Sequence, residues 1–300
     1  MNKLISVIVP TYNRCSLLCE LLNSLLHQSL LSHQFEVIIV DDGSIDDTQK
    51  TVKEFQGKMF NLVYLEQTNK GPAAARNHGA SQAQGKYIAF TDDDCIPEST
   101  WLENAVEAIS QPNIDGIQGK TFTDQRKVRP LTHQIDNQKG HPAVPTCNLI
   151  VDRKLFLKVG GFDEEFPFPH NEDADFAWRF KEIGNIIFND KVSVFHPPRK
   201  ESFLKLSKRM KILESEFLLY HKSPELYKVN RNTSPWKTIY YEVFCINILR
   251  HFKSNFKYFF KPLVMISGML LHLIWWYDLI KLYPKFKVAD KFYQLKFKDV

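Results

Sequence analysis

The sequence predicts an α/β fold in which a mostly parallel sheet is flanked by helices. Short apolar, largely β-branched runs alternate with segments of helical periodicity, which is the pattern of successive βαβ units. The first run, residues 4–9, is almost wholly apolar, as expected of a parallel strand covered on both faces. Acidic or polar turns follow three of these runs, and the carboxyl ends of parallel strands meet at one edge of a sheet.

The individual elements follow from local pattern. A helix is expected at about residues 15–30, because leucines recur there at helical spacing. A second helix opens within residues 169–180, where acidic residues precede an aromatic run. Strands are expected at residues 35–40, 62–65, 86–90, 116–121, 146–151 and 192–199.

Charge divides the chain near residue 200. Residues 1–200 contain 21 Lys and Arg against 26 Asp and Glu, whereas residues 201–300 contain 18 against 8. We therefore expect a globular domain at residues 1–200, with halves at about 1–115 and 116–200, and a basic, aromatic helical region at 201–300. Five cysteines without a CxxC pair, and no signal-like segment before the first strand, predict a reducing, cytosolic setting.

The second polar turn contains Asp41 and Asp42, directly after a predicted strand. At that position Asp42 is suited to accept hydrogen bonds from a ligand such as a nucleobase N–H. Alternatively, one of the two aspartates caps the helix that follows. Residues 71–79 lack the GxGxxG pattern, so they do not support a dinucleotide site, and Arg76 on their helix either contacts a ligand or forms a surface ion pair.

The third turn is Asp92-Asp93-Asp94. Three adjacent carboxylates repel one another, which makes sense if a divalent cation such as Mg²⁺ or Mn²⁺ lies among them. In an extended segment Asp92 and Asp94 project the same way, so one can bind the metal while the other binds its ligand. The alternative is a solvated acidic turn or the N-cap of a helix starting near residue 97.

Taken together, these motifs resemble those of the inverting family-two glycosyltransferases. The resemblance implies the type-A, Rossmann-like nucleotide-binding fold, and it covers roughly residues 4–198. It rests on seven segments in order: residues 7–14 (VIVPTYNR), 40–44 (VDDGS), 71–79 (GPAAARNHG), 92–94 (DDD), 147–150 (CNLI), 160–164 (GGFDE) and 172–176 (EDADF).

The resemblance implies roles for the residues that match. It makes residues 1–200 a catalytic domain in which Pro10, Tyr12 and Asp42 line the nucleoside site and Arg76 lies near the base or diphosphate. The donor-binding residues expected in full are Pro10, Thr11, Tyr12, Arg14, Asp41, Asp42, Arg76, Asp92 and Asp93.

The same resemblance implies a metal site and a base. Asp94 would bind Mn²⁺ or Mg²⁺, Asp92 would meet the ribose or the metal, and His196 is either a further ligand of the metal or diphosphate or a structural residue. Asp173 is expected to be the catalytic base, with Glu172 beside it as the alternative.

The basic region predicts contact with an anionic surface. Residues 203–220 are expected to form an amphipathic helix, and residues 262–277 are almost wholly apolar, although 16 residues fall short of the roughly 20 that span a membrane. Trp275, Trp276 and Tyr277 beside lysines resemble an interfacial anchor. The alternative is a helix packed on the rest of the chain or across a dimer. Without a recognisable reader motif, no nucleic-acid partner is expected.

The function implied is metal-dependent, inverting transfer of a sugar from a nucleotide sugar, with UDP favoured, to an acceptor hydroxyl. The expected acceptor is a glycan or a lipid-linked molecule in polysaccharide or glycolipid synthesis at the cytoplasmic face of the membrane. Two alternatives are a non-catalytic membrane-associated scaffold that binds nucleotide sugars and a sugar-1-phosphate nucleotidyltransferase. The second expects a glycine-rich loop after the first strand, and residues 10–14 contain no glycine.

Overall fold

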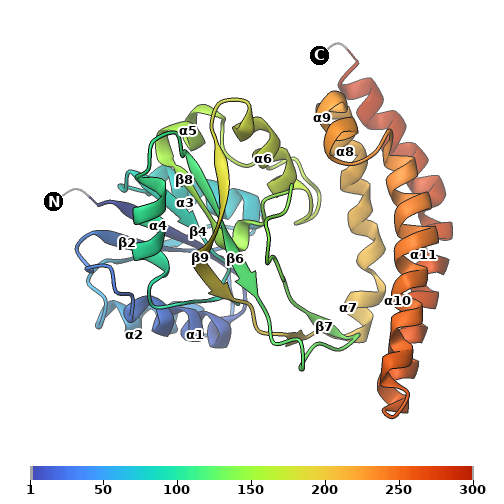
Figure 1. Ribbon diagram of the computed structural model, residues 1–300, viewed down its shortest axis with the longest axis horizontal. Coiled ribbons are helices and arrows are strands. Elements are labelled where there is room, and N and C mark those ends of the chain that lie inside the picture. Colours follow the sequence, from blue (N-terminus) through green and yellow to red (C-terminus); the bar gives the residue numbers. More distant parts are fainter. Residues whose placement is uncertain (1–2, 299–300) are drawn as a thin grey trace. The chain divides into compact units, whose positions relative to one another are not determined.

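The computed structural model describes residues 3–298, which form two compact units (Figure 1). The first unit comprises Met1–Thr123, Ile135–Glu165 and Glu172–Pro197. The second comprises Asp124–Gln134, Phe166–Asn171 and Pro198–Val300. The first unit holds a large sheet, and the second is mainly helical.

The first unit is built on an eight-stranded sheet in the order β3-β2-β1-β4-β8-β6-β9-β5. The first four strands of this order pair in parallel, as do β6 and β9. β8 runs antiparallel to β4 and β6, and β5 runs antiparallel to β9. The predicted, mostly parallel sheet is therefore confirmed. The strands are β1 Ile5–Thr11, β2 Phe35–Asp41, β3 Leu62–Glu66, β4 Tyr87–Phe90, β5 Ile96–Pro97, β6 Gly116–Phe122, β8 Leu149–Asp152 and β9 Ile186–Phe195.

Helices cover both faces of this sheet. Successive side chains of a strand point to opposite faces, so Val7 and Val9 enter one core cluster and Ile8 the other. The first cluster includes residues of α1 (Cys15–Leu26), α2 (Thr48–Gln56) and α4 (Trp101–Ile109). The second includes residues of α3 (Pro72–Gln82), α5 (Arg153–Lys158) and α6 (Glu172–Lys181). Burial on both faces explains the near-continuous apolar sequence of β1 and β2.

Helix α3 lies unusually close to the sheet because its sequence is rich in small residues. A Cβ atom added to Gly79 would lie 2.6 Å from Cγ2 of Ile8 on β1. A larger residue at this crossing would therefore displace the side chain of Ile8. The close approach fixes the position of Arg76, which lies one turn earlier on the same helix.

Some boundaries differ from those predicted. α1 ends at Leu26 rather than near residue 30, because the chain turns toward α4 and the backbone N–H of Ser29 donates to Ser99 O at 2.8 Å. Residues 146–148 form the short 3-10 helix η1 instead of the start of a strand. β9 begins at Ile186, six residues earlier than expected, because that segment pairs with the start of β6.

The second unit is a bundle of helices with a small two-stranded sheet. Its strands, β7 (Thr132–His133) and β10 (Arg199–Lys200), pair antiparallel. Its helices are α7 Phe203–Ser207, η2 Arg209–Glu214, α8 Ser215–Lys222, α9 Pro224–Asn230, η3 Lys237–Asn247, α10 Ile248–Ser254, η4 Asn255–Tyr258 and α11 Pro262–Lys296. A core of its own joins these helices and includes Met210, Leu213, Phe217, Leu279 and Phe286.

Two expectations for this unit are corrected. The single helix predicted at residues 203–220 is broken into α7, the 3-10 helix η2 and α8, and its apolar residues Leu206, Met210, Leu213 and Phe217 are all buried. The apolar segment at residues 262–277 is part of a 35-residue helix, because core residues continue at helical spacing beyond it. By length and composition, with a mean hydropathy of 1.6 over 18 residues, α11 is the one helix in residues 3–298 able to cross a membrane.

Candidate active site

The three polar turns meet at one edge of the sheet, as predicted. In the parallel register, Thr11 lies opposite Asp41, and Ile8 lies opposite Phe90, directly before the acidic turn. The hydroxyl of Thr11 donates to Oδ2 of Asp93 at 2.9 Å, which joins the first turn to the third. The first turn is also joined to the second, because the backbone N–H of Asn13 donates to Oγ of Ser44 at 2.8 Å.

Asp41 and Asp42 are both buried and both stabilise local structure. Asp41 accepts hydrogen bonds from the backbone N–H of Ser44 and from the hydroxyl of Tyr64, each at 2.7 Å. Asp42 accepts from Gln67 and from the backbone N–H groups of residues 70 and 71, at 2.8–2.9 Å. Neither aspartate caps α2: Oδ1 of Asp46 accepts from the N–H of Thr48 at 3.1 Å instead.

The acceptor capacity of Asp42 is not exhausted by these bonds. A carboxylate offers about four acceptor positions, and three of those of Asp42 are used. Its contacts hold the loop that leads from β3 into α3, so the same side chain shapes the entrance to the helix that carries Arg76. Nearby, Pro10 is buried within β1, whereas Tyr12 is 48% exposed.

Arg14 pairs with the acidic turn. Its Nη1 lies 2.9 Å from Oδ1 of Asp93 and 3.7 Å from Oδ2 of Asp94. Burial raises the pKa of Asp93 to about 6, although the charge of Arg14 opposes this increase. The side chain of Asp93 is therefore held in place by its hydrogen bond with Thr11 and its ion pair with Arg14.

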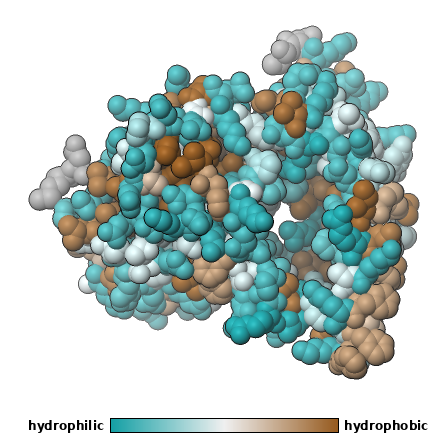
Figure 2. All heavy atoms as spheres, viewed as in Figure 1, coloured by the Kyte–Doolittle hydropathy of each residue, from teal (hydrophilic) through white to brown (hydrophobic). Residues whose placement is uncertain are grey.

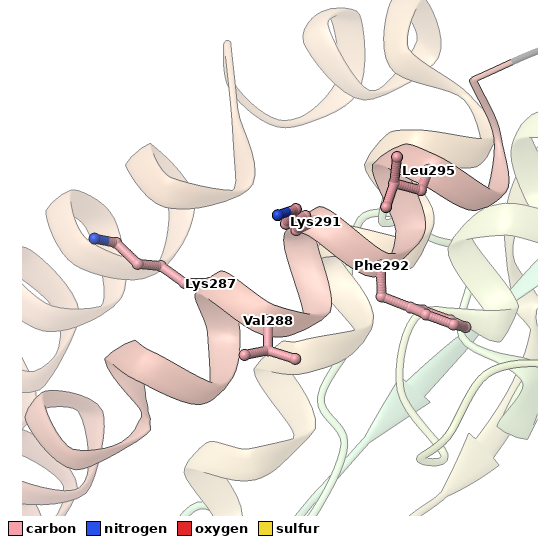
Figure 3. A pocket seen from close by; sticks show the side chains of 5 residues that line it. All are labelled: Lys287, Val288, Lys291, Phe292 and Leu295. Atoms are coloured by element: carbon pink, nitrogen blue, oxygen red, sulfur yellow. The ribbon is translucent and has the colours of Figure 1, made fainter.

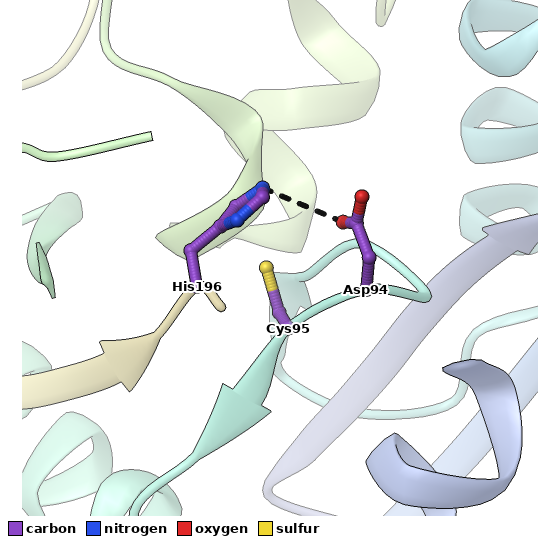
Figure 4. A group of neighbouring side chains, drawn as sticks. All are labelled: Asp94, Cys95 and His196. Carbon is purple, nitrogen blue, oxygen red and sulfur yellow. Dashed lines mark ion pairs between the residues drawn. The ribbon is translucent and has the colours of Figure 1, made fainter. Parts of the chain in front are cut away.

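Asp94 and His196 form a cluster suited to a metal ion (Figure 4). Nε2 of His196 lies 3.6 Å from Oδ1 of Asp94, and both side chains are buried. Two neighbouring ligands of an octahedral ion with bonds of about 2.1 Å lie roughly 3 Å apart, so this separation requires only a small adjustment. Carboxylate and imidazole also suit Mn²⁺ chemically, so the residues fit the expected ion.

Cys95 belongs to the same cluster, and the sequence interpretation assigned it no role. Its Sγ and the ligand atoms of Asp94 and His196 all lie within 4.8 Å of one another. A hydrogen bond with Cys147 and burial raise the pKa of the Cys95 thiol well above its usual value. Because a coordinating thiol must lose its proton, Asp94 and His196 are the better donors. Adjacency to Asp94 was the only signal in the sequence.

Arg76 links the acidic turn to the start of α6. Its Nη2 lies 2.7 Å from Oδ1 of Asp92, and its Nη1 lies 3.6 Å from Oε1 of Glu172. Arg76 is only 5% exposed, so the alternative of a surface ion pair does not apply. Burial by itself would raise the pKa of Asp92, but the charge and hydrogen bond of Arg76 lower it.

Glu172 and Asp173 open α6, and their environments differ. Glu172 is buried, and its Oε2 has no hydrogen-bond partner among residues 3–298. Burial and the charge of Asp173 raise the pKa of Glu172 to about 8, against the opposing charge of Arg76. Asp173 is only half-buried, and its Oδ1 accepts from the N–H of Ala174 at 2.8 Å.

The fold and this site define a transferase of the nucleotide-sugar class. The family model of glycosyl transferase family 2 matches residues 6–183, well over half of the chain. The chain therefore belongs to glycosyl transferase family 2 and is a glycosyltransferase that acts on nucleotide sugars. This membership confirms the resemblance drawn from the sequence and counts against both a non-catalytic scaffold and a nucleotidyltransferase.

Similar curated proteins support the same class. Glycosyltransferase AglE of Haloferax volcanii is 29% identical over 204 residues, which cover 65% of this chain and 67% of that protein. Poly(ribitol-phosphate) beta-N-acetylglucosaminyltransferase TarS of Staphylococcus aureus is 38% identical over 111 residues, 37% of this chain and 19% of that protein. The match thus spans about two thirds of the first relative and a fifth of the second.

Solved structures show the same fold at low identity. S. aureus TarS 1–349 in complex with UDP-GlcNAc has a TM-score of 0.60 and 19% identity, covering 94% of this chain and 92% of that one. The mannosyltransferase PcManGT from Pyrobaculum calidifontis, in complex with GDP-Man and Mn²⁺, has a TM-score of 0.62 and 18% identity, covering 98% and 84%. The type-A fold is therefore established.

Proposed function

We propose that the chain is a metal-dependent, inverting glycosyltransferase that moves a sugar from a UDP-sugar to an acceptor hydroxyl. One observation carries the proposal. The acidic turn at residues 92–94 contacts His196 on one side, and on the other Arg76 joins it to Glu172, next to Asp173. The groups that we propose to bind the donor, hold the metal and accept the proton would thereby belong to one connected cluster.

The donor nucleotide would bind at the turns after β1 and β2. The nucleoside site would be lined by exposed Tyr12, buried Pro10 and the remaining acceptor position of Asp42. The backbone around that site would be positioned by Thr11, Arg14, Asp41 and Asp93. Nε and Nη1 of buried Arg76 have no hydrogen-bond acceptor within residues 3–298, which leaves donors for a base or phosphate oxygen. The UDP-GlcNAc complex of TarS supports a UDP donor, while the GDP-Man complex of PcManGT shows that the fold also binds GDP-sugars.

Asp94 and His196 would hold Mn²⁺ or Mg²⁺, with Asp92 at the metal shell or the ribose. When bound, such a cation neutralises the charge that develops on the departing diphosphate. The Mn²⁺ in the PcManGT complex supports a metal of this kind. The charge of Arg14, 3.7 Å from Asp94, partly offsets the repulsion between the neighbouring carboxylates.

Asp173 would act as the catalytic base. An inverting displacement needs one base, which takes the proton of the acceptor hydroxyl while the oxygen attacks the anomeric carbon from the face opposite the leaving nucleoside diphosphate. The base must be reachable by the acceptor, and Asp173 is more exposed than Glu172. Glu172 is instead buried beside Arg76, so we assign it to holding that arginine.

The acceptor would be a glycan or lipid-linked molecule, used in cell-surface polysaccharide or glycolipid synthesis. Peripheral contact with the cytoplasmic face of a membrane fits the excess of lysine and arginine after residue 200 and the exposed apolar residues of α11. A reducing compartment fits the five cysteines, all of which are free thiols.

The test is a nucleotide-release screen across UDP-, dTDP- and GDP-sugars with Mn²⁺ or Mg²⁺, on the full chain in detergent. Asp173→Asn is expected to abolish transfer but keep nucleotide binding, because only the proton acceptor is lost. Asp94→Ala is expected to weaken nucleotide binding only when the metal is present. Glu225→Gln, whose side chain is 83% exposed, is the matched control and is expected to behave as the wild type.

If Asp173→Asn turns over at the wild-type rate, Asp173 is not the catalytic base. If Asp94→Ala binds the donor as tightly as the wild type does, both with and without Mn²⁺, Asp94 does not bind the metal. Release of GDP or dTDP, but not UDP, by the wild type would overturn the proposed donor while leaving the transferase class intact.

A further inference from the structure

Helix α11 exposes a continuous apolar stripe along its whole length. The most exposed apolar side chains recur at intervals of three and four residues, with exposed Pro284 dividing the longer interval from Ile280 to Val288, so they lie on one face of the helix. We call this face the outer stripe: Leu263, Ile266, Leu270, Leu273, Tyr277, Ile280, Val288, Phe292 and Leu295, with exposed fractions between 48% and 83%. In Figure 2, apolar side chains gather over the part of the chain that Figure 1 labels α10 and α11.

The opposite face of α11 is buried in the core of its own unit. Its buried residues are also spaced by three and four: Gly268, Leu271, His272, Leu279, Leu282, Phe286, Ala289 and Tyr293. The indole N–H groups of Trp275 and Trp276 donate to the carbonyl oxygens of Leu206 and Phe244, each at 2.7 Å. The indole N–H groups of both half-buried tryptophans are therefore turned toward the bundle, and of the three residues in the predicted interfacial anchor Tyr277 lies on the outer stripe.

Lysines border the outer stripe. Helix α11 carries five lysines and two aspartates, and all five lysines are exposed. Asp290 is turned into the bundle, where it lies 2.7 Å from Nε2 of His221 and accepts from the indole of Trp236 at 2.7 Å. Figure 3 shows Val288 and Phe292 extending from the same side of the helix, in an open hollow that Lys287 and Lys291 also line.

The turn before α11 repeats the same chemistry. Phe256, Phe259 and Phe260 are 56%, 65% and 93% exposed. Lys257 and Lys261, also exposed, lie between and next to them. Apolar rings interleaved with lysines continue the outer stripe beyond the start of the helix.

We propose that the outer stripe is a docking surface for an anionic lipid bilayer, and that α11 lies in the plane of that surface rather than crossing it. The apolar side chains would enter the boundary between headgroups and acyl chains, and the bordering lysines would contact anionic headgroups. The inference rests on the membrane contact in the proposed function and specifies its surface and orientation, but it does not depend on the proposed reaction.

A crossing arrangement conflicts with the packing of α11. The helix is about 52 Å long, whereas the hydrocarbon core of a bilayer is about 30 Å thick. If α11 crossed the bilayer, lipid would surround it on all sides. Its inner face is instead occupied along its length by α8, η2 and η3, which carry charged side chains such as the buried Glu216. Within α11 the outer stripe is the face left exposed to contact lipid, which is the geometry of a helix lying on a membrane.

A second copy of the chain is a poorer occupant. Spacing by three and four also suits a coiled coil, but such a seam requires complementary charges at its borders. The lysines of α11 lie in its C-terminal half, and residues 262–277 contain no carboxylate. In a parallel dimer the lysines of one copy would face the lysines of the other, and in an antiparallel dimer they would face an uncharged segment. Anionic lipid supplies the opposite charge that the stripe itself lacks.

The experiment is co-sedimentation of the full chain with vesicles of phosphatidylcholine alone or with 30% phosphatidylglycerol. The test variant carries Ile266→Gln, Leu270→Gln and Leu273→Gln. A matched control exchanges the same residue types at exposed sites of the first unit: Leu31→Gln, Leu157→Gln and Ile183→Gln. Since each test residue is at least 48% exposed and each control residue at least 37%, both variants are expected to fold as the wild type does.

The wild type and the control are expected to bind the anionic vesicles, and the test variant at least about tenfold more weakly, because three apolar side chains no longer enter the bilayer. Replacing Lys281, Lys285 and Lys287 by Gln is expected to reduce binding to the anionic vesicles, by about fivefold per lysine, and to leave binding to neutral vesicles unchanged.

Equal binding of the test variant and the control would overturn the docking surface. So would a wild type that binds neither vesicle but sediments as a dimer that the test variant does not form. A labelling experiment tests the orientation of α11 on the bilayer. Two variants, Ser254→Cys and Lys298→Cys, each also carry Cys245→Ser, and each is bound to vesicles and treated with an impermeant thiol reagent added outside them. Labelling of both sites supports the in-plane helix, and protection of one site would show that α11 crosses the bilayer.

Discussion

Replacing Glu172 by Gln is expected to remove a pH-dependent destabilisation of the fold. Glu172 is buried at the start of α6, beside Asp173, with a pKa raised to about 8. A glutamate in the unfolded chain has a pKa of about 4.3. Between these values the folded protein keeps the proton on Glu172 and the unfolded chain releases it, so the free energy of unfolding falls as the pH rises.

The size of this effect follows from the separation of the two pKa values. Within the window, one proton per molecule is released on unfolding, which changes the free energy of unfolding by about 1.4 kcal/mol per pH unit. From pH 5.5 to 7.5 the wild type is therefore expected to lose about 3 kcal/mol relative to Glu172→Gln. All other groups titrate in both proteins and largely cancel in the difference.

The assay is urea unfolding of both proteins at pH 5.5, 6.5 and 7.5, with the free energy obtained from the midpoint and slope. Glu225→Gln serves as the control, because the same chemical change on an exposed side chain is expected to give a difference that does not vary with pH. A difference between wild type and Glu172→Gln that also stays constant over this range would refute the reasoning.

Three further substitutions test the packing around the site and in the helical unit, each by urea unfolding at pH 7. Arg76→Met leaves the partly buried carboxylate of Asp92 without its cation and is expected to cost about 3 kcal/mol; a loss under 1 kcal/mol would show that the pair contributes little. Gly119→Ala places a Cβ against the carbonyl oxygen of Val192 and is expected to cost about 3 kcal/mol, so wild-type stability would contradict the close contact. Tyr227→Phe removes the donor that lies 2.7 Å from Oε2 of buried Glu216 and is expected to cost about 2 kcal/mol, with no effect on nucleotide binding.

Much of the fold could be predicted because its signals are local. The strands β1 to β4 are short apolar runs that end in polar turns, and each was expected within one or two residues of its observed position. Parallel pairing then requires that the turns after β1, β2 and β4 share one edge, whatever the rest of the chain does. The meeting of Thr11 with Asp93 is a consequence of that rule.

The outer stripe of α11 was harder to predict because apolar residues surround the first half of that helix. In residues 262–277 the sequence shows no polar face, so it cannot tell which residues pack on the bundle and which stay exposed. Packing against α8 and η3 makes that choice, and it turns the two tryptophans inward. The expectation of a short apolar segment failed for the same reason, since only contacts with the bundle reveal that the helix continues to Lys296.

For the acidic turn at residues 92–94, the sequence by itself determined that three carboxylates end a buried strand, at the same edge as two other polar turns. Tertiary structure decided how they are used: Asp93 is fixed by Thr11 and Arg14, Asp94 faces His196, and Asp92 pairs with Arg76. These partners come from segments up to about a hundred residues away. The pairing of Asp92 with Arg76 depends on how α3 packs on the sheet, as Gly79 shows, and that of Asp94 with His196 depends on where β9 lies in the sheet; local sequence records neither.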